Sequence, residues 1–138
     1  MKKLILFFAI LFSMGMQAQK ADVKYVNVRN VYDFQTEANE YRLNSALKNK
    51  MQSLGYIVYF DNEIPEDVRL NPCLEYRAEL TEIKSSTATK LNLAITDCKG
   101  KIVFSKEGVS KLKLHKKSYI DAFNKIFEYS NIDILAKK

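Results

Sequence analysis

Residues 73–98 read CLEYRAELTEIKSSTATKLNLAITDC, and this stretch decides the fold. Apolar and polar side chains alternate over residues 74–81 and again over residues 91–96. Such alternation is typical of strands that bury one face and expose the other. A polar connection, residues 84–87, separates the two runs. We therefore predict an antiparallel hairpin.

The hairpin places the two cysteines of the chain near each other. A tight connection through residues 85–86 would pair Leu80 with Leu91 and set Cys73 opposite Cys98. Cα atoms of antiparallel partners lie about 4.5–5.5 Å apart, which suits a disulfide. Closing this loop would stabilise the fold by about 3 kcal/mol. The alternatives are two buried free thiols or a redox-active pair, although no CxxC spacing supports the latter.

The residues before the hairpin have the pattern of a parallel crossover. Residues 23–28 are rich in β-branched and aromatic side chains and predict a strand. Residues 33–36 supply helix-starting side chains, and apolar residues at helical spacing follow over residues 41–54. Gly55 is suited to close this helix, and residues 56–60 predict a buried strand. Two strands joined through a helix are expected to be parallel.

An acidic loop, residues 61–72, comes before the hairpin. Within it we predict one helical turn at residues 65–68, since Pro suits the first helical position and acids complement the helix dipole. After the hairpin, Asp first and Gly fourth in residues 97–100 favour a tight turn into a strand at residues 102–104.

The last helix is predicted at residues 119–127, where apolar side chains recur at helical spacing. Residues 109–115 fit either a strand or the start of this helix and are left unassigned. Together the elements predict an α+β fold in the order β-α-β-β-β-α. This is a two-layer sandwich in which two helices cover one face of a mixed sheet of four strands, or five if residues 102–104 join it.

The chain starts with the pattern of a secretory signal. Two lysines precede an unbroken apolar run, residues 4–12, and small or flexible residues follow it up to Ala18. The competing interpretation is a core helix. We predict a signal peptide at residues 1–18 and a single domain at residues 19–138, periplasmic or secreted. No cysteine near the junction would accept a lipid anchor, and no later run has the length of a transmembrane helix.

Basic residues are concentrated in one segment. Without its first 18 residues the chain has a net charge of +4, yet residues 99–117 alone sum to +6. Such a segment could bind an envelope protein, an acidic glycan or an anionic lipid surface. The competing interpretation is an exposed strand edge, where lysines prevent aggregation. The candidate partner-binding residues are Lys99, Lys101, Lys106, Lys111, Lys113, Lys116 and Lys117.

Chemistry-bearing motifs are absent from the sequence. The single histidine, His115, lies among lysines and is expected to be solvated rather than to act as a base or metal ligand. The acids of residues 61–67 lack the spacing and glycine of a calcium loop. No catalytic, nucleotide or zinc motif is present. We expect no catalytic residues, metal or cofactor, and the export signal and few arginines disfavour nucleic acid.

Several short runs carry a resemblance to known proteins. These are Asn71–Cys73, Thr96–Phe104, Glu107–Lys111, and Tyr119, Ala122 and Phe123. With them the chain resembles a family of small uncharacterised proteins exported by Gram-negative bacteria, which implies no assigned activity. In layout it is similar to small periplasmic α/β adaptor domains such as the amino-terminal domain of TolB.

These observations favour a non-enzymatic envelope or secreted domain that binds a partner through residues 99–117. The alternative is a small enzyme or ligand carrier whose pocket is built from residues scattered in the sequence.

Overall fold

The computed structural model describes residues 23–128 and Ile132. The predicted signal peptide, residues 1–18, lies outside the described residues. The elements in chain order are β1 (Tyr25–Val28), η1 (a 3₁₀ turn, Glu40–Arg42), α2 (Leu43–Ser53), β2 (Ile57–Phe60), α3 (Glu66–Leu70), η2 (a 3₁₀ turn, Pro72–Leu74), β3 (Glu75–Ile83), β4 (Thr89–Thr96), β5 (Ile102–Ser110) and α4 (His115–Phe127).

The strands form one mixed sheet in the order β2-β1-β3-β4-β5. Strand β1 is parallel to β2 and to β3, whereas β3, β4 and β5 are antiparallel neighbours. The predicted α+β fold is confirmed, and so is the parallel crossover. The five-stranded form of the prediction is the right one, because β5 pairs with the whole length of β4.

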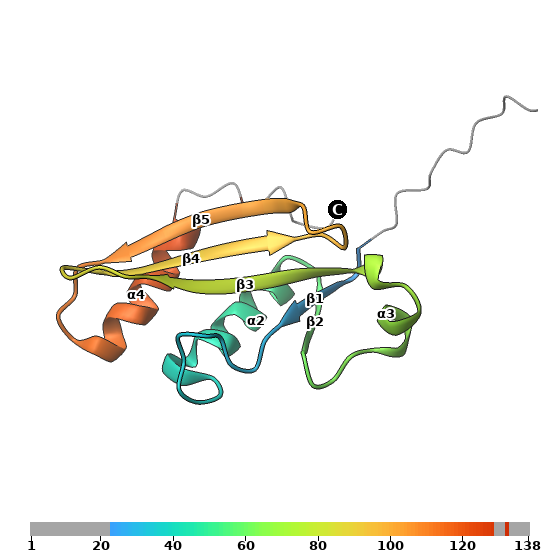
Figure 1. Ribbon diagram of the computed structural model, residues 1–138, viewed down its shortest axis with the longest axis horizontal. Helices are drawn as coiled ribbons and strands as arrows, with labels where there is room; N and C mark the ends of the chain where they lie inside the picture. The colour runs from blue at the N-terminus through green and yellow to red at the C-terminus, as the bar shows by residue number, and fades with distance from the viewer. Residues whose placement is uncertain (1–22, 129–131, 133–138) are drawn as a thin grey trace, which may run out of the picture.

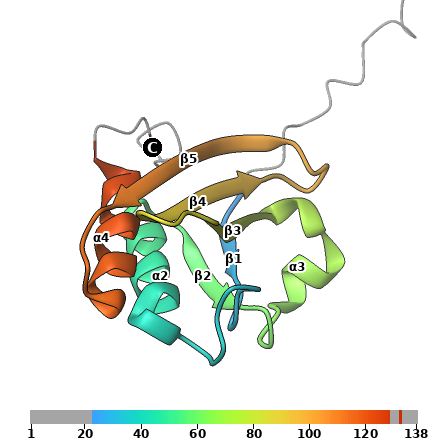
Figure 2. The same cartoon turned by 60° about the vertical axis from the view of Figure 1, so that its left-hand side comes forward.

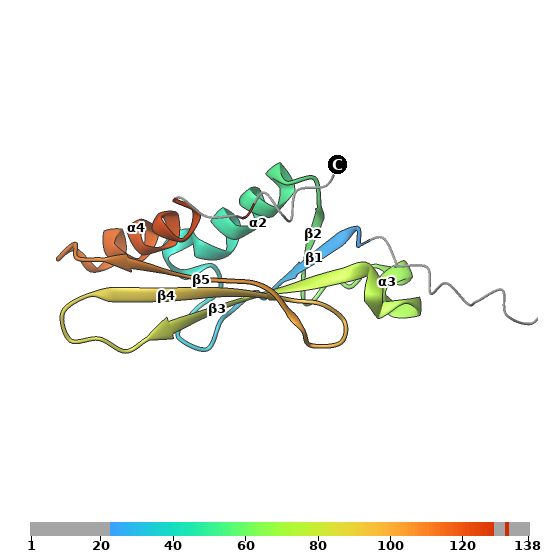
Figure 3. The same cartoon turned by 90° about the horizontal axis from the view of Figure 1, so that it is seen from above.

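Helices α2 and α4 lie side by side on one face of the sheet (Figures 1, 2 and 3). Their apolar stripes meet the inward side chains of the strands in one core, which includes Leu47, Leu93 and Ile126. On the opposite face, the Tyr25 hydroxyl donates to Asp67 Oδ2 of α3 at 2.7 Å. Helix α3 lies at the far end of the molecule from α4 (Figures 1 and 3). The predicted helical turn at residues 65–68 is thus confirmed as α3.

The first helix begins later than predicted. Residues 33–36 form no helix, and α2 starts only at Leu43, directly after η1. A buried amide pair explains the difference. Gln35 Nε2 donates to Asn44 Oδ1 at 2.7 Å, and Asn44 Nδ2 donates to the Arg29 and Asn30 carbonyls. Because buried polar groups require partners, these amides hold residues 29–39 as a loop before η1. Gly55 has φ 97° and closes α2 as predicted.

The hairpin register differs from the predicted one by two residues. Leu80 lies opposite Leu93, not Leu91, because β3 extends to Ile83 and moves the connection forward. A shift of two residues preserves which side chains face the core, so the apolar pattern alone could not detect it. The predicted buried strand is confirmed in part as β2, since Val58 and Tyr59 are buried. It lies at an edge of the sheet, where the Ile57 side chain is exposed.

Strand β5 and helix α4 touch at Gly108. A Cβ atom at this position would lie 1.9 Å from the Ala122 carbonyl oxygen and 2.8 Å from the Ile126 nitrogen. Both are backbone atoms, which cannot rotate away. The absence of a side chain at Gly108 therefore sets how closely α4 packs on the sheet.

Candidate functional site

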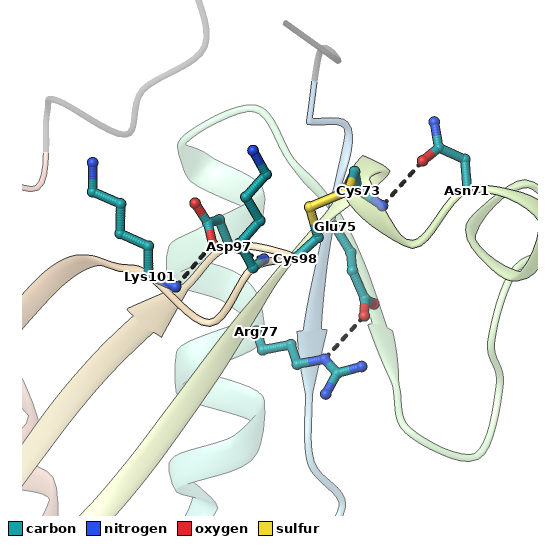
Figure 4. The surroundings of a disulfide bond; sticks show 8 residues. Asn71, Cys73, Glu75, Arg77, Asp97, Cys98 and Lys101 are labelled. Carbon is teal, nitrogen blue, oxygen red and sulfur yellow. Dashed lines mark hydrogen bonds and ion pairs between the residues drawn. A yellow bond between two sulfur atoms is a disulfide. The ribbon is translucent and has the colours of Figure 1, made fainter.

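A disulfide closes one end of the sheet (Figure 4). Cys73 and Cys98 are bonded, with Cα atoms 4.8 Å apart. The predicted pairing is confirmed, although the strand register used to predict it was wrong. Cys73 lies in η2 and Cys98 in the β4–β5 turn, so the bond links two turns instead of facing strand residues. We call this region, with α3, the disulfide end.

Hydrogen bonds fix the backbone of the same end. Asp97 Oδ1 accepts from the backbone N–H groups of Lys99 and Lys101, each at 2.9 Å. Asn71 Oδ1 accepts from the Cys73 N–H at 3.1 Å. Gly100 has φ 77°, in agreement with the predicted turn. This end therefore acts as a covalent and hydrogen-bonded clamp.

Close to the clamp lies a buried acid that the sequence did not reveal. The Glu75 side chain is 5% exposed, and its Oε1 atom accepts from Arg77 Nε at 3.1 Å (Figure 4). Its Oε2 atom is buried and has no hydrogen-bond partner among the described residues. The period-two pattern had placed Glu75 on the polar face of the hairpin. The turn η2 and the neighbouring strand β1 leave it little contact with solvent.

The structure spreads the predicted basic segment over three places along β5. Lys99 and Lys101 belong to the disulfide end. Lys106 lies on β5, and its Nζ donates to the Glu128 carbonyl oxygen. The remaining four lysines, Lys111, Lys113, Lys116 and Lys117, lie beyond the other end of β5. Nine residues of strand span about 27 Å, so the seven lysines do not form one surface.

An open groove lies where α4 begins. It has a volume of about 400 Å³ and lies between η1 and the first three turns of α4. Its lining residues are Tyr41, Arg42, Lys116, Lys117, Ile120, Asp121 and Asn124. Arg42 joins the lysines here from a segment more than 70 residues earlier in the chain, and the sequence did not predict this. We call the cations Arg42, Lys111, Lys113, Lys116 and Lys117 the α4-end basic surface.

The five cations of this surface are exposed and unpaired within the described part of the chain. Ion pairs form elsewhere, between Arg29 and both Asp33 and Glu79, and between Arg77 and Glu75. Asp121, the one acid of the groove, is already committed: it pairs with Lys125 at 3.2 Å and accepts from the Ser110 hydroxyl at 2.6 Å. These contacts, the Ser110 bond first, lower the pKa of Asp121. Within the described residues, the cations that line the groove therefore have no ion-pair partner.

Backbone strain is concentrated beside the groove. Asn39, Tyr41 and Arg42 have φ values of 57–58°, a left-handed conformation that non-glycine residues seldom adopt. Asn39 is held by a reciprocal contact, in which its Nδ2 donates to Ser45 Oγ and its Oδ1 accepts from the Ser45 N–H. Such strained positions cluster at functional sites. Here they turn Tyr41 and Arg42 toward α4.

An aromatic cluster forms the wall behind the groove. The rings of Tyr41 and Tyr119 stack with centroids 4.1 Å apart, and His115 meets both edge-on. His115 is exposed, as predicted, but its Nε2 also lies 3.1 Å from the Tyr41 hydroxyl. The Tyr119 hydroxyl donates to Glu82 Oε1 at 2.9 Å. Burial, followed by this bond to Glu82, raises the pKa of Tyr119. The cluster fixes the position of Tyr41 and with it the groove.

Two acids of the predicted loop, Asp61 and Asp67, have structural partners. Asp67 accepts from the Tyr25 hydroxyl, which raises the pKa of Tyr25, and Asp61 Oδ1 accepts from the Asn30 N–H. Over the described residues, no three His, Cys, Asp or Glu side chains converge as a metal site would require. Within the same part of the chain, every helix is too short or too polar to cross a bilayer.

These features define a small α+β domain with a clamped end and an open, cationic end. No family model matches the chain, and no curated protein matches it. Among solved structures, it is similar to the PelC dodecamer from Paraburkholderia phytofirmans, with a TM-score of 0.50 and 13% identity over 86% of this chain and 92% of that chain. A single-substitution variant of that PelC dodecamer gives a TM-score of 0.50 and 16% identity over 85% and 92%. At these identities the likeness concerns the fold.

Proposed function

We propose that this chain is an exported, non-enzymatic domain of the cell envelope that binds an anionic partner through the α4-end basic surface. One observation carries the proposal: exposed cations from two distant segments, Arg42, Lys116 and Lys117, line one groove. Lys111 and Lys113 are exposed in the loop just before α4, and none of the five is neutralised within the described residues. Like charges held together without counterions repel each other, so an anionic partner that neutralises them binds favourably.

The disulfide supports the export part of the proposal. Disulfides persist in oxidising compartments such as the periplasm and the extracellular space. The Cys73–Cys98 bond therefore fits the compartment to which the predicted signal peptide would direct the chain.

The groove supports binding rather than electrostatic repulsion alone. Its residues are positioned by strained backbone at Tyr41 and Arg42 and by ring stacking of Tyr41 on Tyr119. A lysine-rich strand edge that served only to prevent aggregation would need no such positioning. The pre-formed geometry lowers the entropy lost when a partner binds.

The test uses a soluble polyanion, polygalacturonate, and two variants of equal charge. One variant carries K111Q, K113Q, K116Q and K117Q. The control carries K24Q, R69Q, K99Q and K101Q, which removes four exposed cations from the disulfide end. At about 0.3–1 kcal/mol for each exposed contact, the first variant is expected to bind at least about tenfold more weakly.

The control variant should bind within about twofold of the unmodified chain at the same salt concentration, since it leaves the groove intact. Equal weakening of both variants would show that net charge alone drives binding. No measurable binding by the unmodified chain would reject the proposed function.

A further inference from the structure

The loop between β5 and α4 exposes two leucines among the unpaired cations. It reads Lys111, Leu112, Lys113, Leu114, and the leucines are 51% and 62% exposed. Neither leucine belongs to the hydrophobic core. Exposed apolar side chains are common one at a time, but two in a four-residue loop, each flanked by cations, form an amphipathic surface.

The conformation that displays these leucines is fixed by hydrogen bonds. Ser110 is fully buried, accepts from the Leu112 N–H at 3.2 Å and donates to Asp121 of α4. The Leu114 carbonyl accepts from the Ser118 N–H at 2.9 Å, in the first turn of α4. Both ends of the loop are therefore anchored, and the leucines point away from the core as part of the ordered fold.

We propose that this loop docks on an anionic lipid bilayer, with Leu112 and Leu114 entering the acyl boundary and the α4-end basic surface contacting the head groups. The inference rests on the proposed function and names its partner. Interleaved apolar and cationic side chains match the two layers of a bilayer surface, where apolar groups and Lys or Arg contribute together. Leu112 and Leu114 both lie in the four-residue loop between β5 and α4, and both are more than half exposed.

Other anionic partners match this surface less well. A soluble acidic glycan would satisfy the lysines but would leave the leucines in water. A protein interface with leucines at its centre would be depleted of lysine there, because lysine is disfavoured in interface cores. Four lysines around two leucines therefore favour a lipid surface.

The first experiment places a fluorescent reporter in the loop. The chain contains no tryptophan. A Leu112→Trp variant therefore carries a single reporter, and Ile102→Trp places one at the disulfide end, where Ile102 is 58% exposed. With vesicles of phosphatidylglycerol and phosphatidylcholine, L112W emission is expected to shift to shorter wavelength, whereas I102W emission should stay unchanged. The absence of a shift for L112W, or equal shifts for both, would overturn the inference.

The second experiment measures binding by vesicle sedimentation. We expect L112S/L114S to bind the phosphatidylglycerol vesicles about tenfold more weakly than the unmodified chain, and to bind polygalacturonate equally well. The control L70S/I102S removes two exposed apolar side chains from the disulfide end and should bind vesicles normally. Pure phosphatidylcholine vesicles should bind at least tenfold more weakly.

The outcomes separate the two proposals. If polygalacturonate binds but vesicles do not, or if L112S/L114S binds vesicles normally, the lipid inference fails and the proposed function stands. If neither ligand binds, both fail. Unchanged polygalacturonate binding by L112S/L114S also shows that this variant is folded.

Discussion

Both ends of the sheet carry exposed lysines, but their surroundings differ. At the disulfide end, a covalent bond and the Asp97 carboxylate fix the turn that carries Lys99 and Lys101. At the α4 end, the described residues contain no disulfide, the backbone at Tyr41 and Arg42 is strained, and five cations have no ion-pair partner within the described part of the chain. The comparison teaches that lysine density in a sequence does not locate a binding surface. The clamped end serves stability, and the open end is the candidate for binding.

The largest effect on stability is expected from a substitution at Gly108 on β5, the strand that runs between the two ends of the sheet. Gly108→Ala should destabilise the fold by about 3 kcal/mol or more, because the added Cβ would overlap backbone atoms of α4. Gly100→Ala is the control: its Cβ would meet no atom within 4 Å, so only the left-handed φ is penalised, by about 1 kcal/mol. Urea unfolding of both variants measures the difference. Equal losses would contradict the close packing of α4 on β5.

Removing the clamp should separate stability from binding. The C73S/C98S variant is expected to lose about 3 kcal/mol of unfolding free energy, because the bond restricts a loop of 25 residues in the unfolded chain. Under conditions where this variant remains folded, its affinity for polygalacturonate should be unchanged. A weakened affinity in the folded variant would show that the disulfide end takes part in binding.

A smaller effect is expected from relieving backbone strain at the α4 end. At Arg42, with φ 58°, the Gly variant should be about 1 kcal/mol more stable than the Ala variant, since glycine adopts this conformation freely. Both Arg42 variants should bind polygalacturonate more weakly than the unmodified chain does. At Arg69, in α3, the order should reverse, because glycine disfavours a helix. Thermal unfolding of the four variants measures these stability differences. If the Gly variant were the more stable one at both sites, or the less stable one at both, the backbone strain at Arg42 would be refuted.

The smallest effect concerns pH. The pKa of Tyr119 is raised in the fold, chiefly by burial. Because the pKa of Tyr119 is higher in the folded chain than in the unfolded chain, the neutral phenol stabilises the fold. This stabilisation is fully present below the pKa of the unfolded chain, about 10, and is lost as the pH rises through the pKa of the folded chain. Tyr119→Phe should therefore be less stable than the unmodified chain at neutral pH, by about 1 kcal/mol for the lost bond to Glu82, and this difference should narrow above pH of about 10. A difference independent of pH would contradict the burial of Tyr119.

Much of the fold could be predicted from the sequence because its signals are local. Period-two alternation identified β3 and β4, helical spacing identified α4, and glycine chemistry identified the ends of α2 and of the β4–β5 turn. The hairpin register could not be predicted, since a slip of two residues keeps every side chain on its face. The start of α2 could not either, because it depends on the buried pairing of Gln35 with Asn44.

The candidate site was only half predictable. The sequence revealed the lysines that follow β5, because they are consecutive. It did not reveal Arg42 or Tyr41, which reach the groove through the packing of η1 against α4 and Tyr119. Left-handed backbone at three non-glycine residues leaves no clear mark in a single sequence. Exposure of Leu112 and Leu114 was equally hidden, because residues 109–115 fitted either a strand or the start of the last helix, whereas residues 111–114 form a loop between β5 and α4.

Amide chemical-shift mapping tests most directly which end binds. Polygalacturonate is added to the isotope-labelled chain, and perturbed amides are assigned to residues. The account predicts that the largest shifts occur at residues 40–42 and 111–124, with residues 97–101 unaffected. Shifts centred on residues 97–101, or spread evenly over both ends, would contradict it.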